Sequence, residues 1–260
     1  MSPRIPILMY HSVSHSAAPR FRRFVVPPDT FARQMAFLRQ NDYRALTVSQ
    51  FIAQREQLTS SARIVVLTFD DGFADFYTDA LPILQQFGFA ATLYVTTQFV
   101  GATSRWLTRE GEATRPLLTW EQLATLARAG IEIGAHSHSH AALDTLAPRA
   151  AQQEIARPKE ILEQRLGVSV NSFAYPFGYY TRAVKKMVQA AGYTSACAVK
   201  YTASSLRDDP FALARLLVDA TARADDFAAL VRRAPMQTFL HTRSLLWRSV
   251  RALRAQKDTL

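Results

Sequence analysis

The sequence predicts an α/β protein, a closed or nearly closed (β/α) barrel with its active site at the C-terminal ends of the strands. The first observation behind this prediction is that short, β-rich apolar runs alternate with longer helical patterns along the whole chain. Such alternation is typical of βαβ units and a mainly parallel sheet. The second observation is the length, because 260 residues hold roughly six to eight such units, which fits one barrel better than two domains.

Each predicted strand is a short apolar run that is rich in β-branched or aromatic residues. Helices are predicted between several of the strands, where apolar residues recur at helical spacing. In the first helix, Phe31, Met35 and Leu38 share one face; the second has a proline near its start, and the third follows Thr119, a good N-cap. In chain order the strands cover residues 5–10, 44–47, 64–69, 91–96, 131–135, 172–175, 194–199 and 213–218, and the helices cover residues 31–41, 79–87, 120–129, 152–166, 182–191 and 224–233.

We predict a single domain over residues 1–240, because no Pro-, Gly- or Ser-rich linker divides the chain and no internal repeat is visible. Residues 101–115, which include Trp106, are expected to form a long surface loop. Residues 241–260 are expected to be a basic, amphipathic tail. A plain docking helix is the favoured interpretation of this tail, and peripheral contact with an anionic membrane is the alternative.

The composition excludes several classes of protein. Hydrophobic residues make up 48% and charged residues 20% of the chain, which is the balance of a folded domain and not of a disordered or fibrous one. Thirty-one Lys and Arg against 21 Asp and Glu give a net charge of +10, which favours anionic surroundings. No nucleic-acid-binding motif accompanies this charge, so no specific nucleic-acid partner is expected.

The cysteine content and the lack of a recognisable leader limit the expected cellular location and the residues that can hold a metal. No signal peptide or membrane-spanning run is visible, so we expect a cytoplasmic protein, with membrane association through the tail left open. Cys197 is the only cysteine. This excludes an intramolecular disulfide and a thiolate metal site, so any metal must be held by His, Asp or Glu.

Polar clusters directly follow four of the predicted strands, at the point where each strand ends. Because the C-terminal ends of parallel strands open on the same face of a barrel, clusters distant in sequence are expected to meet in one pocket. Each cluster alone has an ordinary explanation, such as an Asp-Gly turn, and it is their shared position that indicates a site. The clusters are His11-Ser12, Asp70-Asp71-Gly72, His136-Ser137-His138-Ser139-His140 and Pro176-Phe177-Gly178.

Two adjacent carboxylates and a group of histidines predict a metal centre. Neighbouring carboxylates at the end of an apolar strand repel each other unless a cation or a shared proton relieves them. His136 and His140 are four residues apart, so a helical turn would direct both imidazoles to one side, whereas His138 would point elsewhere. One carboxylate with two histidines suits a divalent ion that holds a water molecule, and the other carboxylate would act as a base in hydrolysis of an amide or ester.

These motifs are similar to those of the polysaccharide deacetylases with a NodB homology domain, carbohydrate esterase family 4. Thr68-Phe69-Asp70-Asp71-Gly72 resembles the family's TFDDG motif, and His136-Ser137-x-x-His140 resembles its H-[ST]-x-x-H motif. By position within these motifs, the resemblance assigns Asp70 as the general base and Asp71, His136 and His140 as metal ligands. Zn²⁺ is the expected metal, and Co²⁺, Ni²⁺ and Fe²⁺ are alternatives for such a donor set.

The third family motif departs from its usual form. Tyr175-Pro176-Phe177-Gly178 resembles R-x-P-Y-G, so the resemblance places Tyr175 and Phe177 at the substrate, and the backbone N–H of Phe177 is expected to help hold the oxyanion. Ala174 stands where many members carry an arginine that orients the base. We expect Arg215, on a later strand, to replace that arginine.

The catalytic acid is also displaced from the family pattern, because the usual C-terminal L-x-H motif is missing from its expected place. Ile7-Leu8-Met9-Tyr10-His11 resembles the first strand of a rearranged subgroup, the poly-N-acetylglucosamine deacetylases, so His11 is the expected acid. His241, in Leu240-His241, is the alternative acid. A purely structural role at a strand end also stays open for His11.

The resemblance therefore implies a distorted (β/α) barrel of about seven strands. It also implies a metal-dependent hydrolase that removes acetyl groups, with N-acetyl groups expected, from a polysaccharide or oligosaccharide. The alternative is a non-catalytic relative that binds metal and carbohydrate, which the missing arginine at position 174 would favour. An acetylated carbohydrate is thus the expected partner. Trp106, Tyr179 and Tyr180 are candidates either for stacking on sugar rings at the rim of the site or for ordinary packing.

Overall fold

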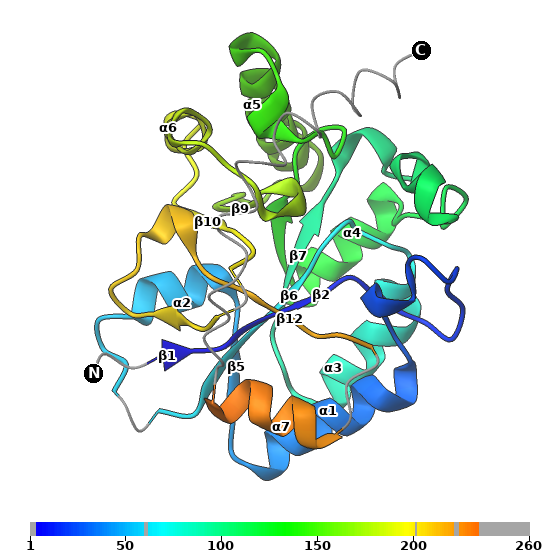
Figure 1. The fold of residues 1–260 in the computed structure, drawn as a ribbon, viewed down its shortest axis with the longest axis vertical. Helices are drawn as coiled ribbons and strands as arrows, with labels where there is room; N and C mark the ends of the chain where they lie inside the picture. The colour runs from blue at the N-terminus through cyan, green and yellow to red at the C-terminus, as the bar shows by residue number, and fades with distance from the viewer. Residues whose placement is uncertain (1–3, 60–61, 201, 221–223, 234–260) are drawn as a thin grey trace.

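The computed structural model describes residues 4–59, 62–200, 202–220 and 224–233, and its centre is one curled β-sheet (Figure 1). Seven strands follow the order β10-β9-β8-β7-β6-β2-β12, and β5 pairs with β6 beside this path. All of these pairings are parallel, so the predicted distorted barrel is confirmed as a curled half-barrel. The strands are β2 (Ile7–Tyr10), β5 (Arg44–Leu46), β6 (Ile64–Phe69), β7 (Thr92–Val95), β8 (Glu132–Ala135), β9 (Ser172–Ala174), β10 (Ser195–Cys197) and β12 (Leu216–Leu217).

The longest strand, β6, lies at the middle of this sheet and every residue in it is buried. β5 pairs with its first half, β7 pairs with its last two residues, and β2 covers the opposite edge. The continuous apolar run of β6 is typical of a strand that is covered on both faces. Its end therefore delivers Asp70 and Asp71 to the middle of the C-terminal edge of the sheet.

Residues 213–217 join the two ends of the sheet. Leu213 forms a parallel bridge to Cys197 of β10, whereas Leu216 and Leu217 of β12 pair with β2. This one segment thus spans the gap between the outer strands of the half-barrel. Arg215 lies between its two contacts and is fully buried.

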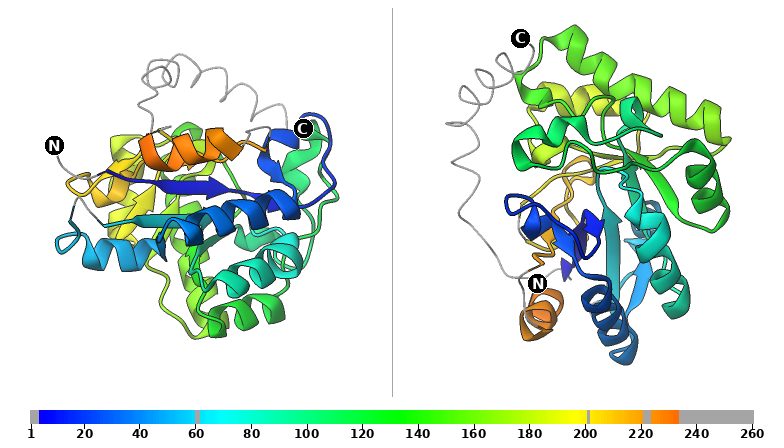
Figure 2. Two further views of the ribbon diagram at one scale, coloured as in Figure 1. Left: turned by 90° about the horizontal axis from the view of Figure 1, so that it is seen from below. Right: turned by 90° about the vertical axis from the view of Figure 1, so that its right-hand side faces the viewer.

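The α-helices of the described chain surround the sheet (Figure 2). Six of them correspond to predicted helical segments, and α4 begins at the predicted cap Thr119, in a capping box with Gln122. The helix α2 is not predicted; it begins at a capping box of Thr47 and Gln50 and is too short to show a clear apolar period. The helices are α1 (Pro28–Gln40), α2 (Val48–Gln54), α3 (Leu81–Phe87), α4 (Trp120–Arg128), α5 (Pro148–Leu166), α6 (Arg182–Ala190) and α7 (Ala224–Arg233).

Shorter elements lie beside the main sheet. Pro6 divides the first predicted strand into β1 (Arg4–Ile5) and β2, and β1 pairs antiparallel with β11 (Ser204–Ser205). β3 (Ser12–Val13) and β4 (Val25–Val26) form a separate parallel pair directly after β2. The 3₁₀ helices are η1 (Arg22–Phe24), η3 (Thr97–Phe99), η4 (Arg105–Glu110), η5 (Leu143–Thr145), η6 (Pro176–Gly178) and η7 (Pro210–Ala212), and η2 (Phe76–Ala80) is a π-helical turn before α3.

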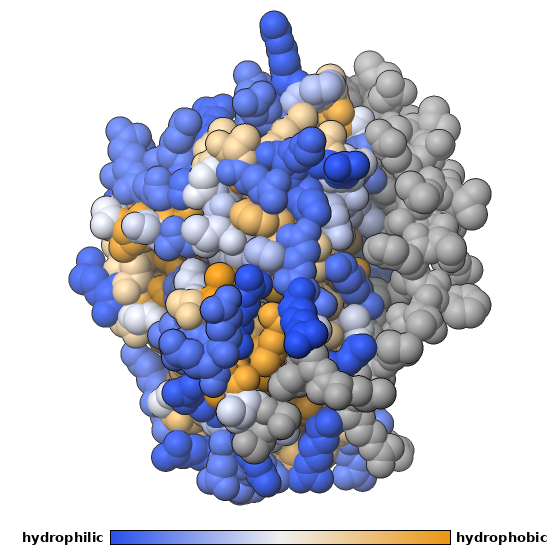
Figure 3. Space-filling model, turned by 90° about the vertical axis from the view of Figure 1, so that its left-hand side faces the viewer, coloured by the Kyte–Doolittle hydropathy of each residue, from blue (hydrophilic) through white to orange (hydrophobic). Residues whose placement is uncertain are grey.

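The predicted tail at residues 241–260 lies outside the described residues, and so does His241, so the domain boundary at residue 240 stays a prediction. No helix in the described part of the chain is both long enough and apolar enough to span a bilayer. The face drawn in Figure 3 is largely hydrophilic, and apolar residues reach it in patches between hydrophilic side chains. Phe177 is the one large hydrophobic side chain that the described residues leave exposed.

Candidate metal centre and active site

The polar clusters that follow the strands meet at one end of the half-barrel, as predicted from their shared position. His11 follows β2, Asp70 and Asp71 follow β6, and the histidine cluster follows β8. Asp71, His136 and His140 each offer one ligand atom, and these atoms lie within 4.8 Å of one another. The three side chains are between 2% and 8% exposed, so they form a compact and nearly buried group.

The distances and the hydrogen bonds of this group fit a divalent cation. Asp71 Oδ1 is 3.2 Å from His140 Nε2 and 3.5 Å from His136 Nε2, and it has no hydrogen-bond partner among the described residues. His136 Nδ1 lies 2.8 Å from the Ala174 carbonyl. A carbonyl only accepts, so Nδ1 carries the proton and the Nε2 lone pair is directed to Asp71. A tautomer fixed in this way is the usual arrangement of a metal-binding histidine.

The backbone at the site adopts a conformation that side chains rarely permit. Apart from glycines, five described residues have a positive φ angle, and four of them are Asp71 (77°), Ser137 (60°), His140 (61°) and Phe177 (60°). Each such residue costs of order 1–3 kcal/mol unless its surroundings impose the conformation. This concentration of strain at one end of the barrel is typical of a functional site, where geometry matters more than local stability.

The expectation that a helical turn aligns His136 and His140 is wrong. The segment after β8 is a loop, because Ser137 and His140 are left-handed, and the Ser137 hydroxyl accepts a hydrogen bond from the backbone N–H of His140 at 3.0 Å. The two imidazoles still converge, with ring centroids 5.0 Å apart. Their convergence is produced by this loop and by its anchors, not by helical periodicity.

Two anchors hold the loop from opposite sides. The Glu154 carboxylate of α5 accepts hydrogen bonds from the backbone N–H of His138 (3.0 Å), from that of Ser139 (2.8 Å) and from the Ser139 hydroxyl (2.7 Å). On the other side, His138 Nδ1 lies 2.9 Å from the Thr97 hydroxyl. The middle histidine is therefore turned toward the end of β7 and away from the metal group. Glu154 carries no sequence motif that would have singled it out.

Asp70 lies beside the metal group and is paired with a buried arginine. Arg215 donates from Nη1 to Asp70 Oδ1 at 2.6 Å and from Nη2 to Oδ2 at 2.8 Å. Burial alone would raise the pKa of Asp70, but the guanidinium, together with His136 and His11, outweighs burial and holds the pKa below its usual value. Asp70 Oδ2 is 4.0 Å from His136 Nε2. The carboxylate is thus ionised and adjacent to the three candidate ligands.

Asp71 also stays ionised, for a different reason. Burial would raise its pKa, but His140, His11 and His136 act against burial and hold the pKa well below the usual range. Burial lowers the pKa of His136 to about 4. Near neutral pH the group therefore presents one carboxylate and a neutral His136 imidazole, which is the protonation that metal binding requires.

His11 lies at the same end of the barrel, partly buried, with its ring 4.8 Å from the ring of Phe24. Burial lowers its pKa, while the nearby charges of Asp71 and Asp70 act in the opposite direction. His11 Nδ1 is buried and has no hydrogen-bond partner among the described residues. The structure therefore brings His11 into the electrostatic field of the two carboxylates, whereas the alternative His241 lies outside the described residues.

Aromatic side chains surround His140. The Trp106 ring stacks on it with centroids 5.2 Å apart, and the Phe177 ring meets it edge to face at 4.7 Å. Phe177 is 53% exposed, so its ring faces both His140 and solvent. Tyr175, which was expected at the substrate, has a fully buried side chain whose hydroxyl donates to the Phe211 carbonyl at 3.0 Å. Its burial leaves that side chain no surface for a substrate.

Comparison with known proteins agrees with this arrangement. A family model described as polysaccharide deacetylase matches residues 57–196. Bacillus subtilis YxkH, provisionally named a polysaccharide deacetylase, is 29% identical over 229 residues, which cover 88% of this chain and 76% of that protein. The poly-β-1,6-N-acetyl-D-glucosamine N-deacetylase of Staphylococcus epidermidis is 23% identical over 226 residues, 84% of this chain and 74% of that protein. The Escherichia coli K12 protein of the same name is 31% identical over 139 residues, which span 51% of this chain and 20% of that protein.

Two solved structures illustrate the likeness in fold. The Streptococcus pyogenes deacetylase PplD, solved in complex with acetate, superposes with a TM-score of 0.76 at 25% identity, covering 89% of this chain and 100% of that one. IcaB from Ammonifex degensii superposes with a TM-score of 0.73 at 22% identity, covering 90% of this chain and 98% of that one. The second likeness supports the fold alone.

Proposed function

We propose that this chain, which belongs to the polysaccharide deacetylase family, hydrolyses N-acetyl groups of a polysaccharide or oligosaccharide with the help of one divalent metal ion. As a member of this family the chain is a hydrolase. The observation that carries the finer proposal is the convergence of Asp71, His136 and His140 on one point while Asp70 is paired with an arginine beside them. The relatives named as N-deacetylases of poly-N-acetylglucosamine favour N-acetyl substrates.

Asp71, His136 and His140 would hold the ion. Zn²⁺ is the expected metal for two imidazoles and one carboxylate, with Co²⁺, Ni²⁺ and Fe²⁺ as alternatives. When bound, such an ion supplies a Lewis acid that polarises the acetyl carbonyl and increases the acidity of a water molecule. The protein's own contribution is to keep Asp71 and His136 deprotonated and to exclude competing water from a nearly buried site.

Asp70 acts as the general base and takes a proton from the attacking water. The two hydrogen bonds from Arg215 keep its carboxylate ionised and fix its orientation. As the acetyl carbon becomes tetrahedral, the backbone N–H of Phe177 donates to the developing oxyanion. Other donors of the surrounding turn are engaged, since the N–H of Gly178 bonds to the Tyr175 carbonyl at 2.8 Å.

His11 acts as the general acid. It donates a proton to the sugar nitrogen as the C–N bond breaks, so that the products are acetate and a free amine. Phe177 and Trp106 are placed to contact the sugar ring next to the reacting group, because aromatic faces bind the apolar faces of sugars. The carbohydrate is therefore expected to lie over the rim that these two side chains form around His140.

The test is acetate release from N-acetylglucosamine oligomers by the metal-loaded chain and by the chain after chelation. We expect release by the loaded protein, its loss on chelation, and its return when Zn²⁺ is added. Asp70→Asn should abolish turnover and leave metal content unchanged, whereas Asp29→Asn, an exposed carboxylate in α1, should have no effect. Retained activity in Asp70→Asn would refute the base assignment.

The alternative of a non-catalytic, metal- and carbohydrate-binding relative rested on the missing arginine at position 174. The guanidinium of Arg215 nevertheless forms two hydrogen bonds with Asp70. The alanine at position 174 therefore no longer favours the non-catalytic alternative. A metal-loaded chain that binds the oligomers without releasing acetate would revive it.

We also propose that the basic tail at residues 241–260 mediates peripheral contact with an anionic membrane. The proposal rests on the basic and amphipathic sequence of the tail. In a flotation assay with vesicles that contain anionic lipid, the full chain should float with the vesicles, and a chain that ends at residue 240 should stay behind. Equal flotation of the two chains would leave the tail with a docking role instead.

A further inference from the structure

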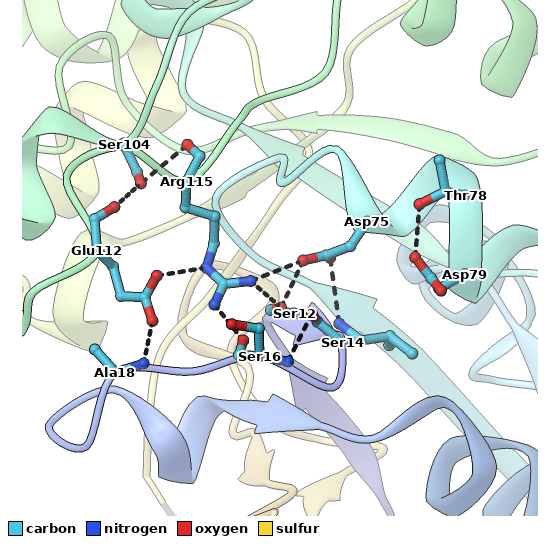
Figure 4. A network of polar contacts seen from close by, with 11 residues as sticks. Ser12, Ser14, Ser16, Ala18, Asp75, Thr78, Asp79, Ser104, Glu112 and Arg115 are labelled. Atoms are coloured by element: carbon cyan, nitrogen blue, oxygen red, sulfur yellow. Dashed lines mark hydrogen bonds and ion pairs between the residues drawn. The ribbon is translucent and has the colours of Figure 1, made fainter.

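A buried polar network holds the chain immediately after His11 (Figure 4). Three segments contribute to it: residues 12–18, which follow His11; Asp75, which follows the motif at the end of β6; and Glu112 with Arg115 from the long loop before α4. The loop was expected to be a surface connection, and its role in this network is not visible in the sequence.

Arg115 lies at the centre of the network, and its side chain is 8% exposed. Its Nη1 donates to the Ser12 hydroxyl at 3.0 Å and to Asp75 Oδ2 at 3.2 Å. Its Nη2 donates to the Ser16 carbonyl at 2.6 Å, and its Nε donates to Glu112 Oε2 at 3.1 Å. A planar guanidinium is suited to this use, because it directs several donors at fixed angles.

The two carboxylates of the network hold the same segment. Asp75 Oδ2 accepts from the Ser12 hydroxyl at 2.6 Å, and its Oδ1 accepts from the backbone N–H of Val13 at 3.2 Å. Glu112 Oε1 accepts from the backbone N–H of Ala18 at 2.5 Å. Residues 12–18 are thus hydrogen-bonded by Arg115, Asp75 and Glu112. Ser12, the first of these residues, directly follows His11 in the chain.

The His11 side chain lacks an equivalent support of its own. Its Nδ1 has no hydrogen-bond partner among the described residues, and its ring is packed against Phe24. Phe24 ends η1, and the strand that follows it, β4, pairs with β3 at Ser12 and Val13. The direction of the imidazole therefore depends on the backbone that the network fixes, and not on a carboxylate bonded to the ring.

We propose that Arg115, together with Asp75, is a positioning residue for His11. The pair fixes residues 12–18 so that the imidazole can reach the leaving nitrogen, and it contributes neither to metal binding nor to attack on the acetyl carbon. This inference rests on the proposed function, because it presumes that His11 is the general acid.

The leaving group provides a way to isolate this role. In N-deacetylation the proton moves from His11 to the nitrogen as the C–N bond breaks, since an amine anion is a very poor leaving group. In hydrolysis of p-nitrophenyl acetate the C–O bond breaks to give a stable phenolate, which needs no proton. A defect confined to proton donation therefore slows the first reaction and spares the second, whereas a misfolded or metal-poor site slows both.

The experiment compares Arg115→Met with wild type on N-acetylglucosamine oligomers and on p-nitrophenyl acetate, with metal content measured for each protein. We expect kcat on the oligomers to fall by about 10-fold to 100-fold, as for partial loss of general-acid catalysis. KM, metal content and aryl acetate hydrolysis should stay within about twofold, a change too small to reflect lost catalysis. Lys159→Met removes a partly buried cation on α5 that pairs with Glu163 at 2.8 Å, and this control should leave the ratio of the two activities unchanged.

His11→Ala separates the failure of this inference from that of the proposed function. If His11→Ala loses oligomer activity selectively and Arg115→Met does not, the positioning role is overturned and the acid assignment stands. If His11→Ala keeps the wild-type ratio, the acid assignment fails and this inference fails with it, while the proposed deacetylation stands. If wild type releases no acetate from oligomers, the proposed function itself fails. Equal losses on both substrates in Arg115→Met would show a structural role only.

Ser12→Ala provides a test if Arg115→Met does not fold. It removes one hydroxyl that bridges Arg115 and Asp75 and keeps the buried ion pair. We expect a selective loss of oligomer turnover of about threefold to tenfold, in line with the loss of a single hydrogen bond, with aryl acetate hydrolysis unchanged. Unchanged oligomer turnover in a folded Ser12→Ala protein would contradict the proposal.

Discussion

Replacing Arg215 by methionine removes the guanidinium that binds both carboxylate oxygens of Asp70. The two N–O distances are 2.6 and 2.8 Å, and the two side chains are 0% and 4% exposed. Methionine fills a similar volume but leaves Asp70 as an unpaired charge in a dry site. Breaking a buried pair by removing one partner typically costs about 3–5 kcal/mol of unfolding free energy, and the full burial of this pair argues for that range.

The same substitution should change the titration of the base. Without the guanidinium, only His136 and His11 act against burial, so the pKa of Asp70 should rise. The ionised base is the active form. The acidic limb of the kcat/KM profile should therefore move to higher pH by the same amount.

Two assays check this reasoning. Urea unfolding of the metal-free proteins measures the unfolding free energy, and the pH profile of kcat/KM on N-acetylglucosamine oligomers reports the pKa of Asp70. The double variant Asp70→Asn with Arg215→Met should be more stable than Arg215→Met alone, because it removes the buried, uncompensated charge. An Arg215→Met protein with stability within about 1 kcal/mol of wild type, the scale of an exposed ion pair, and with an unshifted profile would refute the reasoning.

Three further predictions follow from the site. Burial lowers the pKa of His136 to about 4 from 6.5, so as the pH falls His136 takes up a proton in the unfolded chain before it does so in the folded one. The metal-free protein should therefore lose about 3 kcal/mol of unfolding free energy between pH 6.5 and 4. Urea unfolding in the presence of chelator measures this loss, and His136→Gln should make the unfolding free energy less dependent on pH. Glu154→Ala should weaken metal affinity by about 10-fold to 100-fold in a chelator competition, as for other supporting residues of metal ligands, whereas an equal loss in Glu154→Gln, which keeps an acceptor, would contradict the anchoring role. Gly178→Ala should destabilise the fold by about 2 kcal/mol or more in thermal unfolding, because φ is +76° and a Cβ atom would lie 2.6 Å from the backbone nitrogen of Val199; a Tm equal to wild type would contradict it.

The sequence was sufficient to locate the candidate ligands, because they occur in two contiguous motifs that each follow a buried strand. Parallel pairing then brings the ends of β6 and β8, and with them the two motifs, to the same edge of the sheet. The barrel and six of its seven described α-helices were predicted for the same reason, since apolar periodicity records which faces are buried. Arg215 was a guess from its place near the end of a late strand, and the guanidinium does lie on Asp70.

The features that the sequence did not reveal depend on single residues and on tertiary contacts. The convergence of the two histidines was attributed to helical spacing, but left-handed φ angles at Ser137 and His140 produce it. Nothing in local propensity indicates such angles, because the surrounding structure imposes them. Glu154 and Arg115 act from helix and loop positions outside any motif, so only the folded chain shows what they hold.

The segment that closes the half-barrel is also among the last of the described residues to be synthesised. Asp71, His136 and His140 leave the ribosome well before Arg215, which follows His140 by 75 residues (215 − 140). A nascent chain that ends before this segment thus contains every candidate metal ligand but no counter-ion for its base. On the proposed assignments, the metal ligands are therefore translated before the counter-ion of the base, and pairing of residues 213–217 with β10 and β2 completes the site.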